Sequence, residues 1–308
     1  MTTSGGPVPF RSPANERPWV VPAAFVLLVI LIGSNLVAIR LSNRELAPFW
    51  NAGLRFAIAA ILFGGLVAIR RPPSPSRGAV VGSLAYGLLA ISGFFAFLYF
   101  GLVEAPAAVG QAVLALGPLI TFALAVAVGL ERLSWRPPAG GLVALAGIGL
   151  MSGIGSTSTI PILSLLALVA AATCFASAGI VVKSMQRPDP LIQNAIAATV
   201  GAAVLLAISA LVGEPRALPH DTGTWVALAY LIVPGTVGTF ALLLYLLRQW
   251  PATAVSYQFV LAPIVSISLA AVILNEPITP PVVAGAALVI GGVWIGILAG
   301  SGDPTRVS

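Results

Sequence analysis

The chain has 308 residues, of which 58% are hydrophobic and only 8% are charged, and its mean hydropathy is +1.04. This composition leaves too little polar surface for a soluble globular protein, so the sequence predicts a protein embedded in lipid. The net charge of +6 comes from basic residues scattered over many connections, which argues against a surface that binds nucleic acid.

Long apolar runs follow one another along the chain. A helix needs about 20 mostly apolar residues to cross the roughly 30 Å hydrocarbon core, and unbroken runs of this length favour helices over a β-barrel. We therefore expect an all-α integral membrane protein with ten transmembrane helices. The runs cover residues 19–39, 49–69, 79–103, 106–130, 138–155, 160–183, 190–212, 223–247, 252–274 and 280–300.

The ends of the chain are polar. Residues 1–18 are rich in glycine, proline and serine and are predicted to form a disordered tail, and residues 301–308 a second, short tail. The first apolar run has no evident cleavage site, so we expect it to be retained. Basic residues such as Arg70, Arg71 and Arg136 concentrate in connections on the side of the N-terminus, which predicts cytoplasmic termini in a multi-pass protein of the cell membrane.

Residues that are costly inside a membrane recur at fixed spacing, which indicates an internal repeat. At a separation of 143 residues, Ser34 matches Ser177 and Arg40 matches Lys183. The pairs separated by 145 residues are Gly93 with Gly238, Phe95 with Phe240, Pro106 with Pro251, Pro118 with Pro263, Glu131 with Glu276, Gly140 with Gly285 and Gly147 with Gly292.

The repeat divides the ten predicted helices into two units of five, at 19–155 and 156–300. Because five is an odd number, the second unit enters the membrane from the opposite side. Inverted repeats of this kind are the architecture of many secondary transporters, whose substrate sites lie near the midplane where the repeats meet. The sequence thus predicts transport by alternating access.

Three stretches carry a resemblance to a known family: IGSNLVAIRLSNRELAPFWNAGLRFAIAA at 32–60, GLERLSWRPPAGGLVALAGIGL at 129–150 and LNEPITPPVVAGAALVIGGVWIGI at 274–297. They resemble EamA-type members of the drug/metabolite transporter superfamily. The resemblance implies a ten-helix fold and movement of a small metabolite, such as an amino acid, a nucleobase or a related compound, with export as the expected direction. The second half departs from the first at 186–200, where no arginine matches Arg55.

Polar side chains inside the predicted spans are the candidates for substrate binding. Arg55 lies about 10 Å inside the second span and has no evident deep carboxylate partner, which suggests a substrate with an anionic group such as an amino-acid carboxylate. Snorkelling of Arg55 to the interface is the alternative, as is interhelical hydrogen bonding for the glutamines. The candidates are Ser34, Asn35, Arg55, Gln111, Ser177, Lys183, Tyr257 and Gln258.

Other residues suggest moving parts or structural roles. Pro118 and Pro263 lie near mid-membrane and predict either hinges or packing kinks. Glu131 and Glu276 are expected at corresponding helix ends on opposite faces, with structural roles. The candidates for an aromatic gate, with ordinary packing as the alternative, are Phe94, Tyr99 and Tyr245.

The remaining function classes are less well supported by the sequence. An integral membrane enzyme would need a catalytic constellation, yet the single histidine, His220, falls in a predicted outer loop, and no metal-ligand cluster or phosphate-binding loop is evident. A channel would need a selectivity structure, and no pore-loop signature is evident. We expect no cofactor and no metal; the expected partners are a small-molecule substrate and membrane lipids, and the sequence is compatible with a homodimer.

Overall fold

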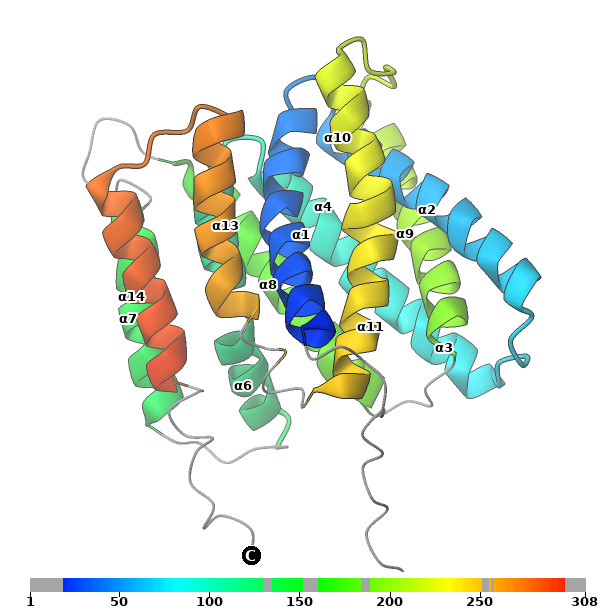
Figure 1. The fold of residues 1–308 in the computed structure, drawn as a ribbon, viewed down its shortest axis with the longest axis horizontal. Helices are drawn as coiled ribbons and strands as arrows, with labels where there is room; N and C mark the ends of the chain where they lie inside the picture. The colour runs from blue at the N-terminus through cyan, green and yellow to red at the C-terminus, as the bar shows by residue number, and fades with distance from the viewer. Residues whose placement is uncertain are drawn as a thin grey trace, which may run out of the picture.

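The structure, a computed structural model, describes residues 19–129, 135–151, 160–183, 189–250, 255 and 258–296. Every regular element in these ranges is a helix, and the helices stand side by side as a bundle (Figure 1). The predicted tails at 1–18 and 301–308 lie outside the described residues. The start of α1 and the end of α14 lie toward the same, lower end of the bundle in Figure 1.

Several predicted membrane spans consist of more than one helical element, because the helix is interrupted within the span. The first half comprises α1 (Val20–Ser42), α2 (Pro48–Arg70), α3 (Arg77–Tyr86), the π-helix η1 (Gly87–Gly93), α4 (Phe94–Gly101), α5 (Ala107–Leu114), α6 (Gly117–Ala127) and α7 (Arg136–Met151). The second half comprises α8 (Ile162–Lys183), α9 (Pro190–Val212), α10 (Thr222–Ile232), the π-helix η2 (Val233–Gly238), α11 (Thr239–Gln249), α13 (Gln258–Ile273) and α14 (Pro280–Gly296).

Within the described residues, seven segments are long and apolar enough to cross a membrane. Two shorter apolar helices, Leu261–Ile273 and Pro280–Gly296, accompany them. The expectation of an all-helical protein with many membrane spans is therefore confirmed. The seven segments are Val20–Ser42, Pro48–Arg70, Arg77–Gly101, Ala107–Ala127, Ile162–Val181, Pro190–Val212 and Thr222–Leu243.

The predicted spans 79–103 and 223–247 are not regular α-helices, because each contains a π-helical turn, η1 or η2. Each turn is supported by a side-chain hydroxyl that donates to a carbonyl five residues earlier. Ser92 bonds the carbonyl of Gly87 at 3.0 Å, and Thr236 bonds that of Leu231 at 2.8 Å. Pro234 has no N–H to donate, which further loosens the backbone ladder in η2.

The two matched prolines differ in their effect on the helix. The predicted span 106–130 breaks after Leu114, and Pro118 lies in the first turn of α6. Pro263, in contrast, lies inside the continuous helix α13. The break falls at Ala115 and Leu116, while Gly117 already belongs to α6. Both prolines lack an N–H, so proline alone does not explain why only one of the two spans is interrupted.

Helices of the two halves pack against each other throughout the bundle. The pairs α2 with α9 and α7 with α14 run along one another, α1 contacts α13 and α10, and α8 contacts α4 and α6. In the tightest pair, a Cβ on Gly140 would lie 2.2 Å from the carbonyl oxygen of Gly292, and one on Gly147 would lie 2.5 Å from that of Gly285. Glycine allows this approach because it has no side chain. The functional side chains thus lie at an interface between halves.

Candidate functional site

Arg55 is the central charged residue of the interior. It lies on α2, seven residues after Pro48, and it is only 2% exposed. A snorkelling arginine would keep its guanidinium in the interface, so the structure contradicts that alternative. Burial of a cation at this depth is costly unless polar groups surround it.

The guanidinium of Arg55 donates to acceptors from three other helices. Its Nε donates to Thr236 Oγ1 at 3.0 Å, and its Nη2 donates to the Gly235 carbonyl at 3.2 Å and to Asn35 Oδ1 at 3.3 Å. Its Nη1 donates to Tyr99 Oη at 3.4 Å. These acceptors are all uncharged, so they solvate the cation without neutralising it. We call these five residues the Arg55 cluster.

Two aromatic rings complete the surroundings of the guanidinium. Its central carbon lies 4.9 Å from the ring centroid of Phe95 and 5.3 Å from that of Phe56. Ring faces attract a cation, which adds about 1 kcal/mol or more when the pair is desolvated. Phe94, a predicted gate residue, packs against Phe95 with ring centroids 4.7 Å apart and therefore supports the wall of the cluster.

The π-helix η2 provides the acceptors that sequence reasoning missed. Gly235 and Thr236 lie in it, and the Gly235 carbonyl accepts from Arg55 and also from Asn35 Nδ2, each at 3.2 Å. Tyr230, which precedes it on α10, hydrogen-bonds the hydroxyl of Ser34. The signal was present in the sequence VPGTVG, since proline and two glycines in mid-span loosen a helix and free its carbonyls.

The two candidate glutamines lie on helices that contact each other. Gln111 on α5 is 2% exposed and Gln258 on α13 is 7% exposed, and α5 packs against α13. The Oε1 atom of each side chain is buried and has no hydrogen-bond partner among the described residues. Buried polar atoms are nearly always paired in proteins, so each of these two orphaned acceptors could bind a polar solute that reaches it.

Two of the remaining candidates have side chains that the structure describes. Ser177 is half-buried on α8, and Tyr245 is half-buried on α11 beside Leu246. Lys183 is the last residue of α8, but its side chain lies outside what the structure describes. Tyr257 and Glu131 lie outside the described residues altogether. Their proposed roles stay predictions.

Glu276 lies just past the end of α13, and its backbone N–H donates to the Ala270 carbonyl of that helix at 3.2 Å. The helix α13 ends at Ile273, and the carboxylate in the following connection forms an ion pair with Arg40, with Arg40 Nε 2.5 Å from Glu276 Oε1. This is the one ion pair among the described residues. Arg40 thereby ties α1 to the opposite half.

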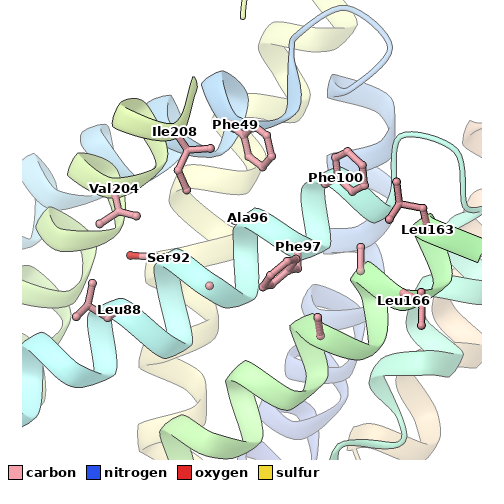
Figure 2. Close-up of a pocket in the computed structure, with 13 residues that line it drawn as sticks. Phe49, Leu88, Ser92, Ala96, Phe97, Phe100, Leu163, Leu166, Val204 and Ile208 are labelled. Carbon is pink, nitrogen blue, oxygen red and sulfur yellow. The ribbon is translucent and has the colours of Figure 1, made fainter. Parts of the chain in front are cut away.

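A separate, largely apolar groove of about 680 Å³ lies on the side of the bundle (Figure 2). Figure 2 shows Leu88, Ser92, Ala96 and Phe97 along one wall and side chains of α8 and α9 on the others. Phe97 is 42% exposed, as expected of a surface that faces lipid. The groove does not include the Arg55 cluster, so it is not the candidate site for a polar substrate.

The bundle of apolar helices with a solvated, buried cation defines a polytopic membrane protein with a polar interior. The model of the EamA-like transporter family matches the chain twice, at residues 20–153 and 162–298. The chain therefore belongs to the EamA-like transporter family, as its resemblance suggested, and it is a membrane transporter rather than an enzyme.

Several individual proteins are similar over most of the chain. A probable amino-acid metabolite efflux pump of Salmonella typhimurium is 29% identical over 88% of this chain and 93% of its own length. An uncharacterized transporter of Archaeoglobus fulgidus is 27% identical over 91% and 98%, and the inner membrane transporter YedA of Escherichia coli is 27% identical over 80% of each chain. A known crystal structure superimposes with a TM-score of 0.62 at 21% identity, covering 90% of this chain and 97% of the other, which supports the fold.

Proposed function

We propose that the protein is a secondary transporter that moves a small metabolite with an anionic group across the cytoplasmic membrane by alternating access, with export as the direction. The observation that carries this proposal is the buried Arg55, which is held by neutral acceptors and has no carboxylate partner among the described residues. A substrate anion would neutralise a charge that the protein solvates but leaves unpaired.

The same proposal includes ten spans arranged as two inverted five-helix repeats, 19–155 and 156–300, with both termini in the cytoplasm. Besides the seven long spans there are three shorter helices, α7, α13 and α14, and each of them borders residues outside the described ranges. The double match of the family model supports two similar halves. The packing supports a twofold relation between them, since α1 contacts α13 while α8, its counterpart, contacts α6.

For the substrate, an amino acid or a close derivative fits the site best. Its carboxylate would pair with Arg55, and its amine or amide hydrogens could donate to the orphaned oxygens of Gln111 and Gln258. The amino-acid metabolite efflux pump of Salmonella typhimurium, a relative over most of the chain, favours the same class and the same direction. Ser34, Ser177, Lys183 and Tyr257 remain proposed contacts of the path, and assembly as a homodimer remains a prediction.

The test is counterflow in liposomes that contain the purified protein. Amino acids, nucleobases and organic acids are screened with and without a proton gradient, and saturable exchange distinguishes a carrier from a channel. Arg55→Gln should lower the exchange of carboxylate substrates by at least about tenfold, because one partner of a desolvated charge pair is lost. The matched control is Arg216→Gln, which changes an exposed arginine in the α9–α10 connection. Parental exchange by Arg55→Gln would overturn the proposed role.

A further inference from the structure

Three glutamates lie in connections at the upper end of the bundle in Figure 1, and each one bonds the start of a helix in the other half. Glu214, in the α9–α10 connection, accepts from the backbone N–H groups of Phe49 at 3.1 Å and Trp50 at 2.7 Å. These are first-turn residues of α2, whose N–H groups have no partner within the helix. A carboxylate of the second half therefore caps a helix of the first.

Glu45 makes the reverse contact. It lies in the α1–α2 connection and accepts from the backbone N–H of His220, and from that of Asp221 at 3.3 Å, immediately before α10. The hydrogen bond from the His220 amide is the main reason why the pKa of Glu45 lies below its ordinary value. Glu45 is thus ionised at neutral pH and carries a full negative charge to the start of α10.

Glu276 supplies the third contact, from the α13–α14 connection. Its Oε2 atom accepts from the N–H of Ala107, the first residue of α5, at 3.2 Å, while its Oε1 atom pairs with Arg40. The Nη1 atom of Arg40 donates in turn to carbonyls that link α4 to α5. These acceptors are Leu102 at 3.0 Å, Val103 at 3.2 Å and Ala105 at 2.8 Å.

Two further hydrogen bonds connect the halves at this end. Trp50 Nε1 donates to the Ala217 carbonyl at 2.7 Å, and Arg44 Nη2 donates to the Leu274 carbonyl at 2.9 Å. Hydrogen bonds with one ionised partner are about twice as strong as neutral ones, and a carboxylate at a helix N-terminus also gains from the helix dipole. The three glutamates and Arg44 therefore form stronger links than Trp50 does.

The sequence offers no equivalent set at the opposite end. The connection at 71–76, RPPSPS, contains no acidic residue, and the connection at 184–189, SMQRPD, contains only Asp189. Asp189 bonds the N–H of Leu191 in its own helix at 2.8 Å. In the sequence repeat, Glu276 and Arg40 are matched by Glu131 and Lys183, but Glu45 and Glu214 have no acidic counterpart.

From this asymmetry we infer that Glu45, Glu214 and Glu276 form a gate that holds the upper end closed and biases the transporter toward the state open at the other end. This inference rests on the proposed alternating-access mechanism. The gate acts by capping helices of one half with carboxylates of the other, so that separating the halves leaves all three helix starts without their acceptors. With cytoplasmic termini, the favoured state accepts substrate from the cytoplasm, which suits export.

A thiol-labelling experiment tests the gate without measuring transport. Ser266 is fully buried on α13 and donates to the Ala107 carbonyl on α5, so a cysteine there reacts only when α13 and α5 separate. Cys174, the single natural cysteine, is replaced by serine, and Ser266→Cys is labelled with a maleimide in nanodiscs, where both faces are accessible. Glu45→Ala, Glu214→Ala and Glu276→Ala should each raise the labelling rate about tenfold, and the Gln variants less, because Gln keeps an acceptor.

Glu104→Gln is the matched control, since Glu104 is an exposed glutamate in the α4–α5 connection at the same end. It should label at the parental rate, and so should Glu131→Gln. Thermal unfolding of each variant shows that faster labelling is not unfolding. Parental labelling in all three Ala variants, or an equal rise in the control, would overturn the gate. If labelling rises as expected but none of the tested solutes undergoes counterflow, the three glutamates do hold the upper end closed, and the proposed substrate class fails instead.

Discussion

Arg55 shows how a membrane protein can keep a cation in its interior. Its guanidinium spreads one charge over three nitrogens, and four neutral acceptors and two ring faces share its solvation. A lysine has a compact charge without this planar geometry and would leave part of the cluster unpaired. The neutral acceptors hold the guanidinium in place without neutralising it, so its charge can still pair with an anion.

Thr236 is the nearest of these acceptors, and its replacement tests whether the cluster orients Arg55. Thr236→Val keeps the shape but removes the hydroxyl that accepts from Arg55 Nε. We expect a loss of about 1–3 kcal/mol in the free energy of unfolding, because the hydroxyl also donates to the Leu231 carbonyl and two hydrogen bonds are lost, and a several-fold rise in the KM for a carboxylate substrate. Thermal unfolding in detergent and saturation of liposome flux measure the two effects.

The control for this change is Thr199→Val on α9, where an exposed hydroxyl bonds only the carbonyl four residues earlier. It should leave the KM unchanged. An unaltered KM in Thr236→Val as well would show that the hydroxyl only supports the fold.

The residues of the cluster were predictable in part. Arg55, Asn35 and Tyr99 are polar or amphipathic groups in apolar runs, and such groups stand out in a sequence because lipid penalises them. Thr236 did not stand out, because a threonine can satisfy its hydroxyl within its own helix. Its contact with Arg55 spans 181 positions of the chain, so it depends on how the halves pack.

At the scale of elements, the glycine contacts between α7 and α14 are the most demanding. A Cβ on Gly147 would lie 2.5 Å from a backbone oxygen and within 3.0 Å of two side chains of α14. Backbone atoms cannot move aside without shifting the helix. We therefore expect Gly147→Ala to cost about 1–3 kcal/mol in the free energy of unfolding, measured by thermal denaturation in detergent.

The same helix contains a matched position for comparison. A Cβ on Gly141 would meet nothing within 4 Å, so Gly141→Ala should be neutral or should stabilise the helix by up to about 1 kcal/mol. Equal stability of the two variants would mean that α7 and α14 can separate at little cost.

Hydropathy predicted where the helices lie but not where they are interrupted. The π-turn η1 contains the residues GLLAISG, whose apolar centre fits a regular helix as well as an irregular one. The break before Pro118 and the continuity through Pro263 were likewise not predictable from proline alone, since the sequence has a proline at both positions. Interruptions depend on backbone energies that hydropathy does not measure.

For the whole molecule, the orientation in the membrane can be tested by the accessibility of engineered cysteines to a thiol reagent. In a Cys174→Ser background, Glu104→Cys lies at the upper end, and Ser74→Cys lies in the exposed α2–α3 connection at the other. With cytoplasmic termini, an impermeant thiol reagent should label the first in intact cells and the second only after permeabilisation, because basic connections stay inside. The reverse pattern would invert the proposed orientation and with it the side that the gate closes.

The sequence predicts the division into two halves better than it predicts the contacts between them. Matched prolines, glycines and glutamates predicted two similar halves, and the double match of the family model agrees with them. The contact of Glu45 with the start of α10 spans 175 positions of the chain, and no pattern in the sequence of the α1–α2 connection predicts it. Such contacts require the packed halves.

The three glutamate caps also affect the hydration of the upper end of the bundle. Once Glu45, Glu214 and Glu276 withdraw, the amide groups at the starts of α2, α5 and α10 lose their acceptors, and bare amides are tolerated only when something hydrates them. Each opening of the upper end must therefore draw water into the mouth, and each closing must expel it. The rate of the cycle then responds to the activity of water as well as to the solute that is carried.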